Sequence, residues 1–159
     1  MELVKQRFDV DLTHVPYRSS PQSIFDIVAD HVNAAFAEAG ISVPLVKDGK
    51  LRALAVSSAT RLDSLPDVQA FAEAANAPDF EVVSWHILFA PAGTPKAIVD
   101  TLHKEMKRIT TAPAFMRQIS AMGLISVASP SVDDMRHYIR SEQEKWGVLV
   151  RRLGLDGSQ

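Results

Sequence analysis

The sequence contains no cysteine among its 159 residues. Disulfides, thiolate nucleophiles and cysteine-ligated metal sites are therefore excluded, while the redox compartment stays open. Long hydrophobic runs are also missing, and residues 1–7 lack the apolar core of a signal peptide. As written, the chain is expected to be soluble and not addressed for export, and thus cytoplasmic if it is a complete gene product.

An excess of positive charge is missing as well. Seventeen Lys and Arg residues stand against 19 Asp and Glu residues, for a formal net charge of −2, and no basic stripe separates from the acidic residues around it. Nucleic acid is therefore not an expected partner. With 47% hydrophobic and 23% charged residues the composition is that of an ordinary globular protein. We expect one domain over residues 1–155 and a loose tail at residues 156–159.

Motifs for catalysis or metal binding are also missing. No histidine pair has the i, i+4 spacing of a helical metal site, and no serine lies in a Gly-x-Ser-x-Gly elbow. A glycine-rich phosphate loop is likewise not present. The sequence thus predicts no catalytic residue, no metal and no cofactor, and ordinary surface or core positions for the five histidines: His14, His31, His86, His103 and His137.

A strand, an elbow and a helix start are predicted around Trp85. Residues 85–89 form a short, bulky, β-favouring run that stops at Ala90 and Pro91. Thr94 can cap a helix, and Pro95 suits the first helical position. The apolar residues that follow recur at helical spacing, with charged residues between them, so a half-exposed helix is expected to pack on the strand.

A second run, residues 51–57, is almost continuously apolar, as expected for a strand covered on both faces of a parallel sheet. Together the two runs predict an α/β fold, a mostly parallel sheet flanked by helices, in which residues 51–57 and 85–89 are buried neighbours or near neighbours.

Local signals place the other elements. Strands are expected at residues 11–15 and 124–127, and helices at 42–49, 68–75, from Pro21, from Pro113 to Gly123, and from Ser131 to Gly154. Residues 31–36 are ambiguous. Their apolar periodicity continues the preceding helix toward Gly40, whereas the alternation of Val32, Ala34 and Phe36 favours a strand.

One polar loop, Tyr17-Arg18-Ser19-Ser20-Pro21, has a functional interpretation. It lies between the end of an expected strand and the start of a helix, where unpaired amides and the helix dipole favour a carboxylate or phosphate and hydroxyls add donors. The alternative is a plain capped helix, with Ser20 as the N-cap and solvated serines. Arg18 is either a long-range attraction for an anion or an ordinary surface arginine.

Several stretches match one family pattern in order. Residues 11–18 resemble a Val-Pro-Tyr-Lys/Arg-Gly-Ser loop, residues 49–56 a Gly-Lys-Leu-Arg-Ala-Leu-Ala-Val strand, and residues 85–95 a Trp-containing strand that runs into Ala-Pro-Ala-Gly-Thr-Pro. Residues 65–68, Gly123 and residues 144–146 continue the match. The sequence thereby resembles the C-terminal half of the Bug-type receptors of tripartite tricarboxylate transporters.

This resemblance implies a portion of a two-lobed type II periplasmic-binding-protein fold, which closes over a small carboxylate and delivers it to membrane transporter subunits from the periplasm. It implies that Tyr17, Ser19 and Ser20 bind the ligand. The sequence departs from the family where Ser19 replaces a glycine, Ala29-Asp30 a glycine-rich turn, Asn33 an acidic residue and Ala37 a polar one. The family's turn at Ala29-Asp30 would end the helix there, which favours the strand at residues 31–36.

The resemblance starts in the middle of the family chain, which is about twice as long. Three functions are compatible with this resemblance to different degrees. The first is a solute-binding protein, or a truncated remnant of one, whose carboxylate binding is weak or lost in the isolated chain. The second is a half-receptor that self-associates as a structural or interaction protein, most simply a homodimer. The third, a small hydrolase, lacks an assembled nucleophile and base. An upstream reading frame with a signal peptide would favour the first over the second.

Overall fold

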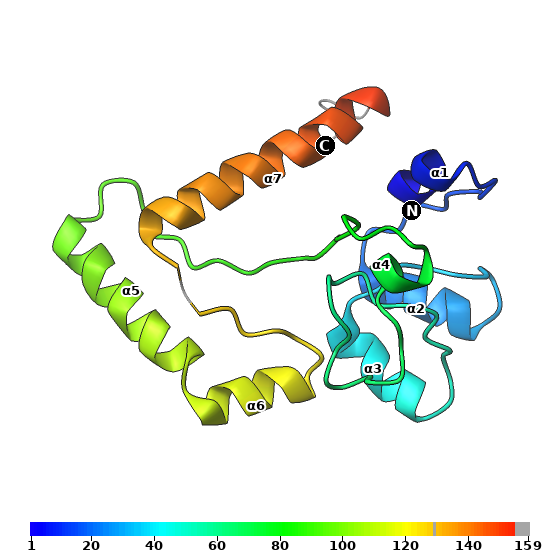
Figure 1. Ribbon diagram of the computed structural model, residues 1–159, viewed down its shortest axis with the longest axis horizontal. Helices are drawn as coiled ribbons and strands as arrows, with labels where there is room; N and C mark the ends of the chain where they lie inside the picture. The colour runs from blue at the N-terminus through cyan, green and yellow to red at the C-terminus, as the bar shows by residue number, and fades with distance from the viewer. Residues whose placement is uncertain (129, 155–159) are drawn as a thin grey trace.

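A computed structural model describes residues 1–128 and 130–154 of the chain (Figure 1). The expected tail at residues 156–159 lies outside the described residues, and the single domain over residues 1–155 stays a prediction. Within the described residues the chain forms seven helices: α1 (Glu2–Phe8), α2 (Ser20–Val28), α3 (Ala39–Lys47), α4 (Phe71–Ala74), α5 (Lys96–Thr110), α6 (Pro113–Ala121) and α7 (Val132–Arg152).

The starts of α2, α5, α6 and α7 lie close to where the sequence places them, whereas α3 begins three residues before the expected Ser42 and α4 three residues after the expected Val68. The N-cap of α2 is Ser19 rather than Ser20, and the N-cap of α5 is Pro95 rather than Thr94, so each differs from expectation by one residue. The N-cap of α7 is Ser131, whose hydroxyl accepts a hydrogen bond from the Asp134 amide at 3.1 Å. This satisfies an amide that the first turn would otherwise leave unpaired, so the expected cap is confirmed.

Glycines follow three of the helices in the left-handed conformation, with φ of 70° at Gly49, 74° at Gly123 and 66° at Gly154. Only glycine adopts this conformation without strain at Cβ, which explains why α3, α6 and α7 end there. Helix α2 ends at Val28, and Asp30 has φ of 59°. The break at Ala29-Asp30 is therefore confirmed, but residues 31–36 form neither a helix nor a strand.

The expected parallel sheet is wrong. In residues 1–128 and 130–154 no strand is formed, and the one β-bridge is an isolated parallel contact between Val56 and Ala70. Its hydrogen bonds join the Val56 amide to the Gln69 carbonyl at 3.0 Å and the Phe71 amide to the Val56 carbonyl at 2.7 Å. One further bond, 2.9 Å long, joins the Val82 amide to the Ser57 carbonyl.

Exposure shows why the apolar runs form no sheet. Leu54 is 70% exposed, Phe89 69%, Leu88 62% and Trp85 38%. A buried parallel strand needs a paired neighbour along its length and a covering layer on each face, and residues 51–57 and 85–89 have neither among the described residues. The segments lack strand pairing, so a helical chain with long irregular connections replaces the expected α/β sheet of a type II binding protein.

The buried core is small and lies among α1 to α4. Phe71 packs between Phe8 and Phe80, with ring centroids 5.5 and 4.3 Å apart, and Phe80 is 2% exposed. Arg7 pairs with Asp79, and its guanidinium lies 6.0 Å from the Phe80 ring centroid. Helix α1, which sequence patterns did not predict, is thus held by aromatic contacts with residues far along the chain.

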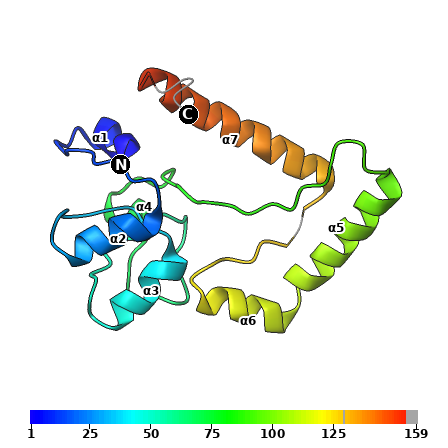
Figure 2. The same ribbon diagram turned by 180° about the vertical axis from the view of Figure 1, so that it is seen from behind.

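Helices α1 to α4 gather on one side of the molecule, and α5, α6 and the start of α7 lie on the other (Figures 1 and 2). Residues 80–90 and helix α7 cross between the two groups. The end of α6 also joins them, because the Ser120 hydroxyl donates to Asp63 at 3.2 Å and Gly123 packs against Ala39 and Val43 of α3.

Candidate ligand-binding site

A cavity of about 540 Å³ lies beside the start of α2. Its wall combines the loop of residues 11–20, the first turn of α2 and residues 31–36. The structure brings Tyr17, Ser19 and Ser20 together in this wall, whereas Arg18 is exposed and is not among the described residues that line it. Asn33, one of the departures from the family pattern, lines the same cavity.

Ser19 sets the entry into α2 with φ of −154° and ψ of 151°. This is extended backbone that any residue adopts, so serine introduces no backbone strain at this position. Among the described side chains none caps the first turn of α2. The Ser23 hydroxyl donates to the Ser20 carbonyl at 2.9 Å instead. The plain capped helix therefore lacks its side-chain cap, and the first-turn amides can serve an anion.

Tyr17 fastens the loop to the helix. Its hydroxyl donates a hydrogen bond of 2.7 Å to Oδ2 of Asp26. This bond, together with burial and the negative charge of Asp26, raises the pKa of the Tyr17 phenol above its ordinary value. Because the hydroxyl is already used by Asp26, Tyr17 orients the loop over α2 and leaves the serine hydroxyls and the backbone amides as donors toward the cavity.

Asp26 also meets His31. The distance between Nδ1 of His31 and Oδ1 of Asp26 is 3.2 Å, and the His31 amide donates to the Asp26 carbonyl at 2.8 Å. Hydrogen bonds from Tyr17 and from His31 lower the pKa of the Asp26 carboxyl. Sequence reasoning missed both Asp26 and His31 as site residues. The available signal was the turn at Ala29-Asp30, where left-handed Asp30 directs the chain back past the end of α2.

The cavity wall has few charged side chains. None of the described lining residues is a lysine or arginine, and the groups that titrate are Asp11, His14, Tyr17 and His31, besides the amino group of Met1. His14 Nδ1 lies 3.3 Å from Oε1 of Glu2. An anion in this cavity would therefore be held by amides, hydroxyls and histidines rather than by an arginine clamp.

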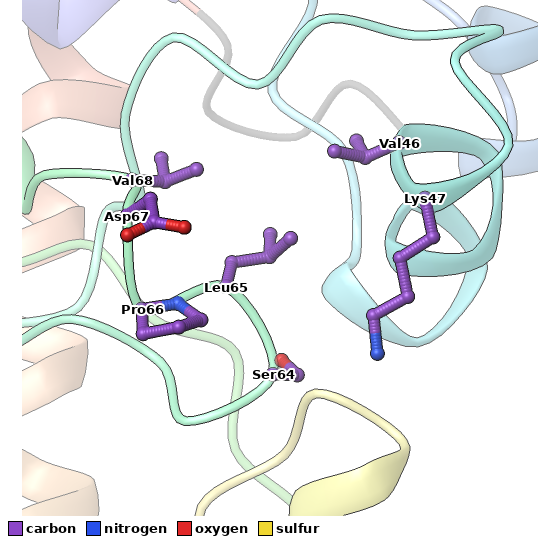
Figure 3. Close-up of a pocket in the computed structure, with 7 residues that line it drawn as sticks. All are labelled: Val46, Lys47, Ser64, Leu65, Pro66, Asp67 and Val68. Carbon is purple, nitrogen blue, oxygen red and sulfur yellow. The ribbon is translucent and has the colours of Figure 1, made fainter.

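A second cavity, of about 340 Å³, lies between the end of α3 and residues 64–68 (Figure 3). It contains none of the sequence-predicted site residues. Its lining is mainly apolar and therefore fits a small carboxylate less well than the serine-rich cavity. The lining residues are Val46, Lys47, Ser64, Leu65, Pro66, Asp67 and Val68.

Two other histidines bond to backbone carbonyls. His103 Nε2 lies 2.6 Å from the Pro130 carbonyl, and His137 Nδ1 lies 2.9 Å from the Asp133 carbonyl. In the part of the chain that the structure describes, no group of three potential ligands is placed to hold a metal ion. No helix in that part combines the length and apolar character needed to span a bilayer.

Solved structures of ligand-bound proteins share the path of this chain. R. palustris Rpa4515, solved with adipate, matches 96% of the chain with a TM-score of 0.84 and 29% sequence identity, over 50% of its own length. MatC from Rhodopseudomonas palustris, solved with malate, matches 94% with a TM-score of 0.73 and 25% identity, over 51% of its length. The chain therefore follows the path of about half of a small-molecule-binding protein.

The family model described as "Tripartite tricarboxylate transporter family receptor" matches residues 1–155. The chain belongs to this receptor family, which confirms the resemblance inferred from its motifs. A UPF0065 protein from the tcbD-tcbE intergenic region of Pseudomonas sp. strain P51 is 34% identical over 99% of the chain. The chain spans 46% of that relative, and about half the length of Rpa4515 and of MatC as well.

Proposed function

We propose that this chain is the carboxylate-binding portion of a tripartite tricarboxylate receptor, and that it holds its ligand without catalysing a reaction. The ligand carboxylate lies at Ser19 and Ser20, at the start of α2, with Tyr17 positioning the loop. The observation that carries this proposal is the start of α2, which no described side chain caps and which borders a cavity of about 540 Å³.

The comparisons support a small carboxylate as the ligand class. Rpa4515 was solved with adipate and MatC with malate, and both molecules are dicarboxylates. Family membership supports delivery of the ligand to membrane transporter subunits from the periplasm. A carboxylate ligand also suits the start of α2 in this chain, because amides and hydroxyls at a helix N-terminus stabilise a carboxylate without a fixed positive side chain.

Binding by the isolated chain is expected to be weak. The structural relatives are about twice as long as the part that matches, so a second wall of the site can come from residues that this chain does not contain. Binding free energy is the surplus over ordering and desolvation costs. Losing one wall of the site removes several kcal/mol of binding free energy, which is enough to turn a micromolar dissociation constant into a roughly millimolar one.

Titration with malate and adipate, followed by backbone amide chemical shifts, tests the site. We expect perturbations to cluster at Tyr17, at residues 19–23 and at residues 31–36, which line the cavity of about 540 Å³ or form the first turn of α2. Shifts that cluster at residues 64–68, beside the smaller cavity, would reject the proposed site. Shifts in neither region, at saturating ligand, would reject carboxylate binding by this chain.

Serine variants sharpen the same experiment. Ser19→Ala and Ser20→Ala remove hydroxyl donors from the cavity wall, and each should weaken malate binding about tenfold, since a hydrogen bond to a charged group contributes about 1.5 kcal/mol or more. Ser42→Ala is the matched control, because the Ser42 hydroxyl donates to the carbonyl of Glu38, the N-cap of α3, and lies outside the lining of this cavity.

A second candidate function is a half-receptor that self-associates as a structural or interaction protein. The observation that favours it is the exposure of large apolar residues on the irregular segments, Leu54, Leu88 and Phe89 among them. Exposed apolar patches beyond a few hundred Å² usually mark interaction sites. In this case the isolated chain would form a homodimer and would not bind carboxylates.

A further inference from the structure

Glu142 is a buried carboxylate in the middle of α7, with 8% of its surface exposed. Acidic side chains are rarely buried unless they are paired, because removing a charge from water is costly. Neither the sequence motifs nor the proposed ligand site uses this residue. Its position therefore needs an explanation of its own.

Two neighbours on α7 pair with this carboxylate. Oε2 of Glu142 accepts a hydrogen bond from Nε1 of Trp146 at 2.9 Å, and Oε1 lies 3.3 Å from the Lys145 ammonium. Lys145 also donates to the Glu81 carbonyl at 3.3 Å, and its ammonium lies 5.2 Å from the centroid of the Trp146 ring. The ammonium thus connects α7 to the irregular segment of residues 81–85.

Aromatic packing joins the same two parts of the chain. Trp85 meets Tyr138 edge to face, with ring centroids 6.0 Å apart and planes at 72°. Tyr138 lies one helical turn before Glu142, on the same side of α7. Two stretches far apart in the sequence, residues 81–85 and 138–146, therefore meet beside this carboxylate, where α7 and residues 80–90 cross between the two helix groups (Figures 1 and 2).

We propose that Glu142 is a positioning residue that fastens α7 to residues 81–85, so that these two crossing elements move as one body. The carboxylate holds Trp146 and Lys145 in place, and Lys145 in turn holds the backbone at Glu81. We call Glu81, Trp85, Tyr138, Glu142, Lys145 and Trp146 the crossing clamp. This fastening operates with or without a ligand, and in a receptor that closes on its ligand it would carry motion of one helix group to the other.

The charges of the clamp favour the ionised carboxylate. Burial alone would raise the pKa of Glu142, but hydrogen bonds from Trp146 and Lys145, with the Lys145 charge, outweigh it and lower the pKa. Besides Glu142 and Lys145, the titratable groups of the clamp are Tyr138 and Glu81; burial raises the pKa of Tyr138, and the negative charges of Glu142 and Glu81 raise it further. Glu142→Gln removes the charge that holds Lys145 while it keeps the shape of the side chain.

Hydrogen exchange tests the fastening at two defined protons. The chain has two tryptophans and therefore two indole N–H signals. The signal that is lost in Trp146→Phe belongs to Trp146. The Val82 amide, bonded to Ser57, reports on the partner segment. In Glu142→Gln we expect both protons to exchange about tenfold faster, whereas Glu144→Gln, an exposed neighbour on α7, should leave both unchanged.

An increase in exchange at Trp146 with no change at Val82 would overturn the proposal, because Glu142 would then act within α7 alone. If Glu142→Gln fails to fold, Trp146→Phe, which keeps the carboxylate but removes its indole donor, must raise exchange at Val82. The pH dependence gives an independent readout. The Trp146 indole resonance should shift as Glu142 titrates, at a pH below the ordinary glutamate value of about 4.3, in the unmodified chain and in Glu144→Gln but not in Glu142→Gln.

Discussion

The Asp26 carboxylate accepts hydrogen bonds from Tyr17 and His31, which makes it an acid-sensitive residue of the candidate site. Its pKa is lower in the folded chain than the ordinary aspartate value of about 3.9. The stabilisation from ionised Asp26 is therefore complete above that value and is lost as pH falls through the folded-state pKa.

We accordingly expect the free energy of unfolding to decrease less steeply below pH 4 in Asp26→Asn than in the unmodified chain. Urea unfolding at a series of pH values measures the difference. Asp48→Asn, at the C-cap of α3 and outside the contacts of Asp26 with Tyr17 and His31, is the matched control. Parallel curves for the Asp26 variant and the unmodified chain would contradict the role of Asp26.

Gly123 combines a left-handed backbone with a crowded position. Its φ is 74°, and an added Cβ would lie 3.0 Å from Cβ of Ala39 and 3.2 Å from Cγ2 of Val43. Gly123→Ala should therefore lower the free energy of unfolding by roughly 2–4 kcal/mol, from backbone strain and overpacking together.

Two other glycines separate these two causes. Gly49 has φ of 70° and open space around its Cβ position, so Gly49→Ala should show the strain alone, about 1 kcal/mol. Gly93 has neither feature, and Gly93→Ala should change stability by less than about 0.5 kcal/mol. Equal losses in all three variants, measured by urea unfolding, would contradict the packing of α6 on α3.

At the level of single residues, the polar loop that contains Tyr17, Ser19 and Ser20 could be found from sequence because it precedes a helix start, and the family resemblance singled out these three residues within it. Sequence reasoning missed Asp26 and His31, because their contact depends on how α2 ends and on the left-handed conformation of Asp30. The pattern of apolar residues continues through that turn and gives no sign of it. Only the comparison of Ala29-Asp30 with the glycine-rich turn of the family indicated that the helix ends at this position.

Helix capping provides a prediction at the scale of elements. Ser131 caps α7 through its hydroxyl, whereas the Ser19 side chain, at the N-cap of α2, makes no such bond within the described part of the chain. Ser131→Ala should lower the free energy of unfolding by about 1 kcal/mol. Ser19→Ala should change it by only a few tenths, and an equal loss in both variants would show that Ser19 caps α2 after all.

Helices α2 to α7 could be predicted from sequence because their signals are local. Apolar spacing, Ser131 before α7, and glycines after α3, α6 and α7 each act within one or two turns. Pairing of strands is different, since it depends on partners distant in sequence and on layers that cover them. Residues 51–57 and 85–89 have the composition of buried strands, but the described part of the chain leaves Leu54, Leu88 and Phe89 largely exposed.

At the scale of the whole molecule, the receptor family follows from the residue identities of separate motifs and not from hydrophobic or charge patterns. The match over residues 1–155 confirms that family. Neither the packing of α1 on Phe71 and Phe80 nor the crossing clamp followed from sequence. Each depends on contacts between residues more than 50 positions apart, for example Lys145 and Glu81.

Self-association is the prediction that belongs to the whole chain. Residues 85–89 form neither a helix nor a paired strand and carry exposed Leu88 and Phe89. Unpaired extended segments with apolar side chains readily pair with a second copy, and a two-fold interface is the simplest closed arrangement. We therefore expect sedimentation velocity to show a dimer of the 159-residue chain at protein concentrations of roughly tens of micromolar.

Phe89→Asp should shift this dimer toward the monomer, because it places a charge on the apolar segment. Phe25→Asp is the matched control, since Phe25 is 72% exposed on α2, away from residues 85–89, and its substitution should leave the dimer intact. A monomeric unmodified chain would contradict self-association. Dissociation by Phe25→Asp but not by Phe89→Asp would place the interface on α2, beside the candidate ligand site, and dimerisation would then compete with carboxylate binding.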